Sequence, residues 1–266
     1  MSKLKFSIIT ASYNSDKYIK QTLESVRDQD YDNIEHVLVD GGSTDKTNTI
    51  IKSFPHVENY ISEPDKGIYD ALNKGVNRAT GDVIGFVHSD DYLKDSTIIS
   101  KIATFLDTHK ATGVYGDIVF VDDDQKVLRH YSSKKWRFNQ FKVGKMPAHP
   151  SFFARKEVYE SYLFDTQYKI AADFDQMLRA FKDPEFNFEY MAIVTTCMRL
   201  GGASTDGLKS NLRINREILN ICKVNGIRTN LIKIYSKYPS RFLEILRGRL
   251  SGKRKAESGK RKAENN

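Results

Sequence analysis

The chain has 266 residues, 39% of them hydrophobic and 29% charged, which is enough for one sizeable core, or for one globular domain with a helical appendage. Its two cysteines, Cys197 and Cys222, are too few for a secreted disulfide framework, so we expect reduced thiols in a cytoplasmic protein. The sequence shows no signal peptide and no run of about 20 apolar residues, which excludes a predicted membrane span.

The net charge of +8 is unevenly distributed along the chain. Residues 209–266 contain 16 Lys and Arg against 4 Asp and Glu, so the part before them is slightly acidic. Such an asymmetry indicates an anionic partner, and both nucleic acid and anionic lipid satisfy it.

Short β-rich runs alternate with helical patterns in the first half of the chain, which predicts βαβ units and a mainly parallel sheet. We expect strands at residues 5–10, 35–39, 59–62 and 83–87, and helices at 16–28, 43–54, 65–79 and 95–109. Ser43 or Thr44 is predicted to cap the second helix, and Gly81 to follow the third in the left-handed conformation.

The pattern changes after residue 110. We predict an antiparallel hairpin, two further strands and a helix, at residues 114–131, 151–155, 188–198 and 172–181 respectively. Residues 1–208 form the predicted catalytic domain, and 209–250 a basic amphipathic helical extension. Residues 251–266 carry GKRKAE twice and are predicted to be disordered.

Polar residues follow three of the predicted strands, in the segments 10–14, 40–43 and 88–91. In an open α/β sheet, ligands bind at the carboxyl ends of the strands. The adjacent carboxylates of Asp90 and Asp91 repel each other and suit a cation or a sugar hydroxyl, although a loop followed by a helix cap is the alternative for this pair alone.

These segments resemble family 2 glycosyltransferases, which have the nucleotide-diphospho-sugar (GT-A) fold. The resemblance is carried, in order, by the segments 7–14 (SIITASYN), 39–45 (VDGGSTD), 63–75 (EPDKGIYDALNKG) and 88–91 (HSDD). It implies an α/β fold with a mainly parallel sheet, a nucleotide-sugar-binding half at about 1–110 and an acceptor half at about 111–208. The segment around residue 65 is similar to the colanic-acid-like branch that builds bacterial surface polysaccharides.

The resemblance also implies how the donor is held. The base would contact Thr10, Ala11 and Tyr13, with Asp40 on the base or ribose. Asp65 and Lys66 would face the phosphates at a helix start, where a solvated lysine is the simpler alternative for Lys66.

A divalent metal, Mn or Mg, is implied at Asp91, with Asp90 on the ribose or the metal. His88 stands where the family often has an acidic residue or asparagine, which leaves open which aspartate binds more of the metal. His149 is a further candidate for the metal or the acceptor, and a structural histidine is an equal interpretation.

The family's catalytic base corresponds to Asp173 in the segment 170–175 (IAADFD), with Asp175 as the fallback. Ala172 replaces a glutamate that is frequent there, and read without the family either aspartate fits the first turn of a helix. Arg199 and residues 201–205 are candidates for a loop that closes over the diphosphate.

We therefore predict metal-dependent, inverting transfer of a sugar from a nucleotide-diphospho-sugar to a hydroxyl of a saccharide or lipid-linked saccharide. A sugar nucleotidyltransferase is the enzymatic alternative, but residues 11–16 lack the glycine-rich basic loop that it would need. The non-enzymatic alternative is an adaptor that binds an anionic membrane or, less expected, nucleic acid through residues 209–262. A peripheral position on the inner face of the cell membrane follows if the membrane is the partner, whereas helices that pack on the catalytic domain are the competing interpretation.

Overall fold

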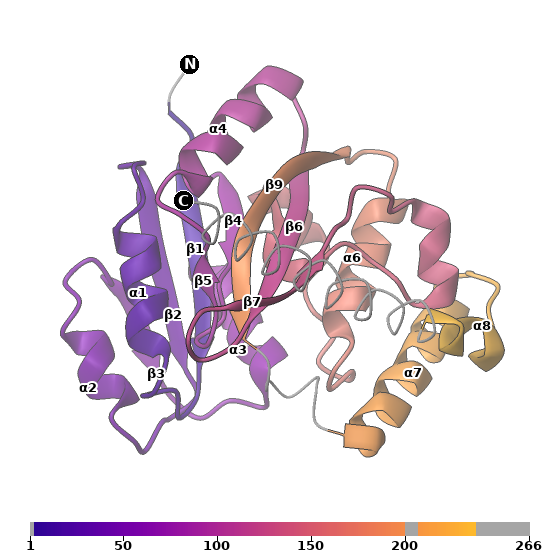
Figure 1. The fold of residues 1–266 in the computed structure, drawn as a ribbon, viewed down its shortest axis with the longest axis horizontal. Coiled ribbons are helices and arrows are strands. Elements are labelled where there is room, and N and C mark those ends of the chain that lie inside the picture. Colours follow the sequence, from indigo (N-terminus) through magenta and orange to yellow (C-terminus); the bar gives the residue numbers. More distant parts are fainter. Residues whose placement is uncertain (1–2, 200–206, 238–266) are drawn as a thin grey trace, which may run out of the picture.

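The computed structural model describes residues 3–199 and 207–237, which form one mixed sheet with helices on both faces (Figure 1). The strands follow the order β3-β2-β1-β4-β8-β6-β9-β5, with β7 paired to β6. Both cysteines are free and buried. Within the described ranges, no helix is both long and apolar enough to cross a bilayer.

The first half contains the parallel part of the sheet. The central strand β1 (Phe6–Ser12) is buried along its whole length and pairs with β2 (Ile34–Asp40) on one side and β4 (Val83–Phe86) on the other. β3 (Asn59–Ser62) extends the parallel sheet beyond β2. The four predicted strands of this half are confirmed, and their carboxyl ends meet at one edge, as parallel pairing requires.

The second half adds strands of mixed direction. β8 (Phe152–Arg155) lies antiparallel between β4 and β6 (Gly113–Val121). β6 and β7 (Val127–Tyr131) form the predicted hairpin. The twelve-residue β9 (Phe188–Arg199) runs parallel to β6, and the short β5 (Tyr92–Leu93) pairs with its end. The sheet therefore brings the end of β9 close to the segment that follows β4.

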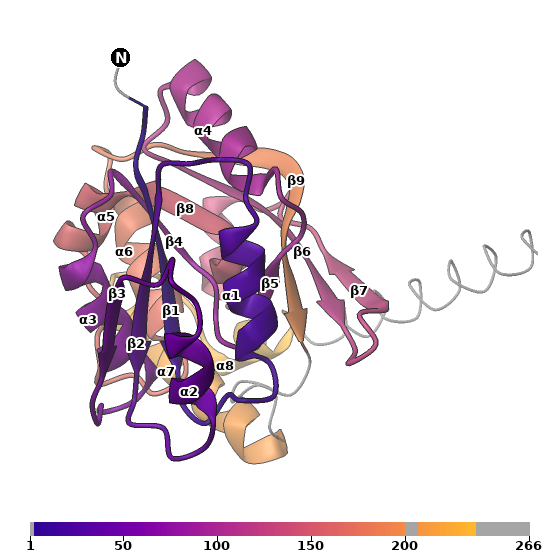
Figure 2. The same cartoon turned by 90° about the vertical axis from the view of Figure 1, so that its left-hand side faces the viewer.

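Helices cover the two faces of the sheet in separate groups (Figure 2). One face packs against α1 (Ile19–Arg27), α2 (Thr47–Lys52) and α4 (Ile98–His109). The other packs against α3 (Ile68–Arg78), α5 (Lys156–Ser161) and α6 (Ala172–Lys182). Two 3-10 helices, η1 (Phe138–Val143) and η2 (His149–Ser151), connect the later strands.

Two local predictions are wrong. Neither Ser43 nor Thr44 caps α2. The hydroxyl and amide of Ser43 instead donate to Asp40, while the Asp45 carboxylate accepts from the amide of Thr47. Gly81 is not left-handed, and α3 ends at an extended Ala79. A Cβ on Gly81 would lie 2.6 Å from the Ser7 Oγ, so glycine is required there by close approach to β1.

The predicted basic extension packs on the catalytic domain in its described part. α7 (Gly207–Val224) and α8 (Leu231–Tyr235) place Ile218, Ile221 and Ile234 in the same core as α3 and α6. The predicted boundary after residue 208 therefore falls within the first turn of α7. Residues 238–250 and the predicted disordered tail at 251–266 lie outside the described residues.

A buried chain of hydrogen bonds crosses the parallel strands. Thr10 donates to the carbonyl of Val87 (2.7 Å), so its oxygen accepts from Nε2–H of His36 (2.9 Å). The Nδ1 of His36 then accepts from His56 (3.3 Å). Burial, and then the neighbouring His56, lower the pKa of His36 from 6.5 to about 3. Burial therefore holds His36 neutral at neutral pH.

We expect this histidine to make the fold sensitive to acid. Below pH 6.5 His36 binds a proton in the unfolded chain but not in the native one. The free energy of unfolding therefore falls by about 1.4 kcal/mol per pH unit as the pH drops towards 3. Urea unfolding at pH 7 and pH 5 should show a smaller pH dependence for His36→Gln than for the wild type. The exposed His109→Gln is the control, and an unchanged dependence in His36→Gln contradicts the assignment.

Candidate active site

Asp40 organises the turn after β2. Its carboxylate is fully buried and accepts hydrogen bonds from the hydroxyls of Ser12, Ser43 and Ser62 and from the amides of Gly42 and Ser43. Burial opposes its ionisation, but these hydrogen bonds, led by Ser43 and Ser62, outweigh burial and lower the pKa of Asp40. All of these donors come from the protein, so Asp40 holds the shape of the turn as a buried anion.

Two residues of the predicted donor site, Tyr13 and Asp65, come together beside this turn. The Tyr13 ring is 63% exposed, and a Cβ on Gly41 would touch it at 3.4 Å. The same Cβ would clash with the Asp65 carboxylate, whose other oxygen accepts from the amide of Gly67 (2.8 Å). Gly41 therefore allows the Asp65 carboxylate and the Tyr13 ring to approach the backbone of the turn closely. Lys66, the next residue after Asp65, is exposed.

Thr10 and Ala11 lie near the carboxyl end of β1. Thr10 is fully buried and bonded to Val87 and His36, and Ala11 is buried beside it on β1. Both residues are thus at the predicted edge of the sheet, but their side chains are buried on opposite faces of it.

Asp90 and Asp91 differ sharply in environment. The Asp91 carboxyl group is 1% exposed; its Oδ1 accepts from the amide of Arg199 (3.1 Å), and its Oδ2 has no donor. Burial and then the charge of Asp90 raise the pKa of Asp91 well above its usual range. Asp90 is half-buried, and its carboxylate accepts no hydrogen bond from the described residues. Asp90 therefore presents the more accessible oxygens.

Arg199 contacts both aspartates. Its guanidinium donates to the carbonyl of Asp90 (2.6 Å) and to the side chain of Gln21, and it lies over the rings of Tyr18 and Tyr92. Arg199 is buried, which differs from its predicted place in a loop over the diphosphate. Residues 201–205 of that predicted loop lie outside the described part of the chain.

His149 is buried among aromatic rings. Its ring stacks on Phe86 (5.1 Å), meets the Phe164 ring edge-on (5.5 Å) and lies 6.3 Å from the ring of His88, all between centroids. Burial, and then His88, lower the pKa of His149 to about 3, so the ring is neutral. Its Nε2 is buried without a partner. Across residues 3–199 and 207–237, no three His, Cys, Asp or Glu side chains are grouped around one metal position.

Asp173 lies in the first turn of α6 and faces α3. The Tyr69 hydroxyl donates to the carbonyl of Ile170 (2.7 Å) and, more weakly, to the carboxylate of Asp173 (3.3 Å). Burial raises the pKa of Asp173 to about 6, against the hydrogen bonds from Phe174 and Tyr69 that lower it. A carboxylate with this pKa is poised to accept a proton near neutral pH.

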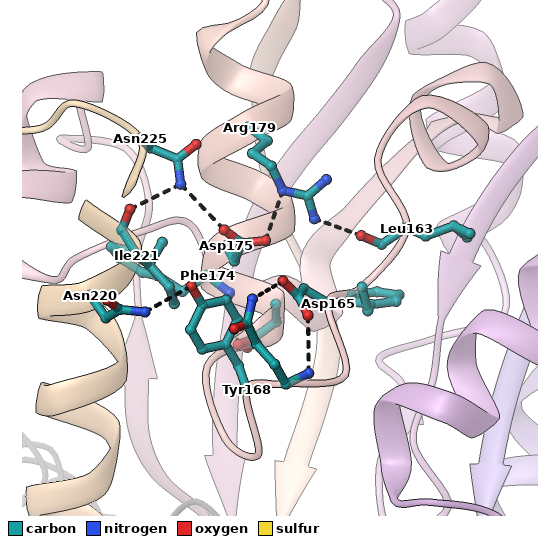
Figure 3. A network of polar contacts seen from close by, with 12 residues as sticks. Leu163, Asp165, Tyr168, Phe174, Asp175, Arg179, Asn220, Ile221 and Asn225 are labelled. Atoms are coloured by element: carbon teal, nitrogen blue, oxygen red, sulfur yellow. Dashed lines mark hydrogen bonds and ion pairs between the residues drawn. The ribbon is translucent and has the colours of Figure 1, made fainter. Parts of the chain in front are cut away.

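Asp175 occupies a structural network instead (Figure 3). It is buried, its Oδ2 pairs with Nε of Arg179 (2.7 Å), and its Oδ1 accepts from Asn225 (3.3 Å). Arg179 also donates to the carbonyl of Leu163 (2.6 Å). The fallback base is thus committed to joining α6 to neighbouring segments, which favours Asp173.

Glu217 of α7 is a site-supporting residue that the sequence reasoning missed. Its carboxylate accepts from the amides of Lys169, Ile170 and Ala171, which lead into α6 (3.0–3.1 Å). These amides lie at and just before the N-cap Ala171, so a distant glutamate holds the backbone that leads into the helix. Tyr69 lies in the segment 63–75 that carries the family resemblance, and no local signal connects either residue to Asp173.

Comparison with known proteins adds the family relationship. The sequence model of the family described as Glycosyl transferase family 2 matches residues 7–163. The "PGL/p-HBAD biosynthesis glycosyltransferase" of Mycobacterium bovis is 28% identical over 244 residues, 88% of this chain and 91% of the relative. An uncharacterized glycosyltransferase of Mycobacterium tuberculosis is 32% identical over 180 residues, 65% of this chain and 68% of the relative.

Solved structures share the fold at lower identity. S. aureus TarS 1–349 in complex with UDP-GlcNAc is 20% identical with a TM-score of 0.65, covering 82% of this chain and 66% of that one. The mannosyltransferase PcManGT from Pyrobaculum calidifontis, in complex with GDP-Man and Mn2+, is 15% identical with a TM-score of 0.65, covering 86% and 66%. The chain therefore spans slightly less than two thirds of these proteins, and the predicted GT-A fold is confirmed.

Proposed function

Because this chain belongs to glycosyl transferase family 2 and is a glycosyltransferase that uses nucleotide sugars, we propose that it transfers a sugar to a hydroxyl of a saccharide or lipid-linked saccharide in polysaccharide biosynthesis. The observation that carries the proposal is the contact of Tyr69 with Asp173, since it joins the donor-side segment 63–75 to a carboxyl group with a pKa of about 6. The PGL/p-HBAD relative supports a biosynthetic role. The family favours this activity over the nucleotidyltransferase and adaptor alternatives.

The donor nucleotide would lie beside the Asp40 turn. The exposed Tyr13 ring supplies a stacking face for the base, while Thr10 and Ala11 lie buried nearby on β1. Asp40 acts mainly through the turn that it holds. The exposed Lys66 ammonium would face the diphosphate. The UDP, UDP-GlcNAc and GDP-Man in related structures support a nucleotide-diphospho-sugar donor.

The acidic pair suits a divalent cation, Mn2+ or Mg2+. Asp90 has a carboxylate without a protein donor, and the Oδ2 of Asp91 is buried without one, so both keep oxygen lone pairs of the kind that hard cations prefer. Asp90 would be the direct ligand, with Asp91 close behind it; the stacking of His149 favours a structural role. When bound, the metal would offset charge on the departing diphosphate. The Mn2+ of PcManGT supports this cofactor.

Asp173 then supplies the base. It accepts the proton of the acceptor hydroxyl while that oxygen bonds to the anomeric carbon. The bond from the anomeric carbon to the diphosphate oxygen breaks in the same step, and the nucleoside diphosphate leaves with the bonding electrons. Attack opposite the leaving group inverts the anomeric configuration. The colanic-acid-like resemblance suggests an acceptor on the route to a surface polysaccharide.

We expect substitutions of the two aspartates of α6 to have different effects on activity and stability. Asp173→Asn should lower kcat by about 10²–10⁴-fold at unchanged stability, since it removes the base. Asp175→Asn should keep activity within about tenfold while losing about 1–3 kcal/mol of stability, because it weakens the Arg179 network. Steady-state kinetics and urea unfolding of both variants test this. The reverse pattern would make Asp175 the base.

We expect the metal dependence of sugar transfer to rely on Asp90 more than on Asp91. EDTA should abolish transfer, and Mn2+ should restore it. In titrations of Mn2+ in the presence of nucleoside diphosphate, Asp90→Asn should weaken metal binding by about tenfold or more, as expected for loss of a charged oxygen ligand. The exposed Asp107→Asn is the matched control. Full activity in EDTA, or wild-type Mn2+ binding in Asp90→Asn, contradicts this assignment.

A further inference from the structure

The end of α7, the following turn and the start of α8 form a surface that we call the apolar–basic tip, residues 223–233. Val224 is 72% exposed, Ile232 is 82% exposed, and Leu231 is also exposed. The exposed cations Lys223, Arg228 and Lys233 are interleaved with them. Figure 1 shows α7 and α8 at one edge of the molecule, on the opposite side from β3.

The tip carries charge of one sign. No Asp or Glu occurs between residues 218 and 237. The preceding acidic residue, Glu217, is committed to the amides before α6. Residues 238–266 continue the basic composition in the sequence, with nine Lys and Arg against three Glu. The Asp175 carboxylate, which contacts Asn225, is paired with Arg179. A surface with this excess of cations attracts an anionic one.

A hollow of about 480 Å³ lies at the tip. Its lining combines apolar side chains with cations: Leu219, Lys223, Gly226, Ile227, Arg228 and Thr229. An apolar interior beside lysine and arginine suits a ligand with an acyl portion and a phosphate.

The fold does not use the exposed apolar side chains. The inner faces of the two helices supply the core through Ile218, Ile221 and Ile234, which are buried. Ile232 and Val224 lie outside that set, so polar residues would serve the fold equally well there. Their exposure beside cations is the pattern of helices that lie in a membrane interface.

We propose that the apolar–basic tip docks on an anionic lipid bilayer. Ile232, Leu231 and Val224 enter the boundary between headgroups and acyl chains, and Lys223, Arg228 and Lys233 bind lipid phosphates. Each cation near such a surface strengthens binding by about fivefold. Nucleic acid is the less suitable partner, since phosphate contacts to it require cations and give no use for an exposed isoleucine.

Docking of the apolar–basic tip would bring α6, which carries Asp173, near the bilayer. Val224 follows Glu217 by seven residues, about 10 Å along α7. Glu217 binds the amides immediately before α6, whose first turn carries Asp173. The docking is independent of the chemistry at Asp173, whereas its use, the delivery of a lipid-linked acceptor, rests on the proposed function.

Vesicle flotation of the full chain tests the proposal. The wild type should bind vesicles of phosphatidylglycerol and phosphatidylcholine, but not phosphatidylcholine alone. Val224→Ser/Ile232→Ser should weaken binding by about tenfold or more with no change in charge, since the apolar insertion is lost. Lys223→Gln/Arg228→Gln/Lys233→Gln should weaken it by about 100-fold. The control Val127→Ser/Leu128→Ser removes two exposed apolar residues from β7 and should bind like the wild type.

Two outcomes overturn the proposal. One is absent wild-type binding to the anionic vesicles, and the other is wild-type binding by Val224→Ser/Ile232→Ser. Binding of duplex DNA that depends on the three cations but not on Ile232, together with either outcome, would identify nucleic acid as the partner. Nucleotide-sugar hydrolysis without vesicles should be equal in all variants, which separates a failure of docking from a failure of the transferase chemistry.

Discussion

The contact between α3 and the segment leading into α6 is the constraint on which the site depends. The Tyr69 hydroxyl bonds to Ile170 and Asp173, and the Asn73 side chain exchanges two hydrogen bonds with the backbone of Phe164 (2.8 and 3.0 Å). These bonds join residues about a hundred positions apart. They fix the base relative to the helix that begins just after Asp65 and Lys66. Without them, donor and acceptor groups would share a fold but have no defined geometry.

The rim of the sheet is held by carboxylates whose surroundings differ. Asp40 is buried and fully satisfied, so it stays charged and shapes the glycine turn. Asp91 is buried with one oxygen unsatisfied, which raises its pKa, and Arg199 fixes its backbone neighbour Asp90 from behind. Asp90 is left accessible. Burial and the number of hydrogen-bond donors thus give the three aspartates different roles: Asp40 shapes the turn, Asp91 supports the site, and Asp90 is available as a ligand.

The sequence predicts the local features well and the long-range ones poorly. The strands of the first half and their polar ends follow from apolar runs and glycine turns, and these are confirmed. The insertion of β8 between β4 and β6 has no local signal, because it depends on packing of the whole second half. Glu217 caps a segment 46 residues away, and Ser43 binds Asp40 instead of capping α2, because tertiary partners compete with local ones. The roles of the site residues remain predictions.

The pH dependence of kcat/KM in Tyr69→Phe and the wild type tests the central claim, that Asp173 is a base tuned by α3. Nucleotide-sugar turnover, to acceptor or to water, should fall below about pH 6 in the wild type, because Asp173 must be ionised. Loss of the Tyr69 hydroxyl removes a hydrogen bond that lowers the pKa of Asp173, so the acid limb should move to higher pH. A limb that stays in place, or moves to lower pH, would contradict the account.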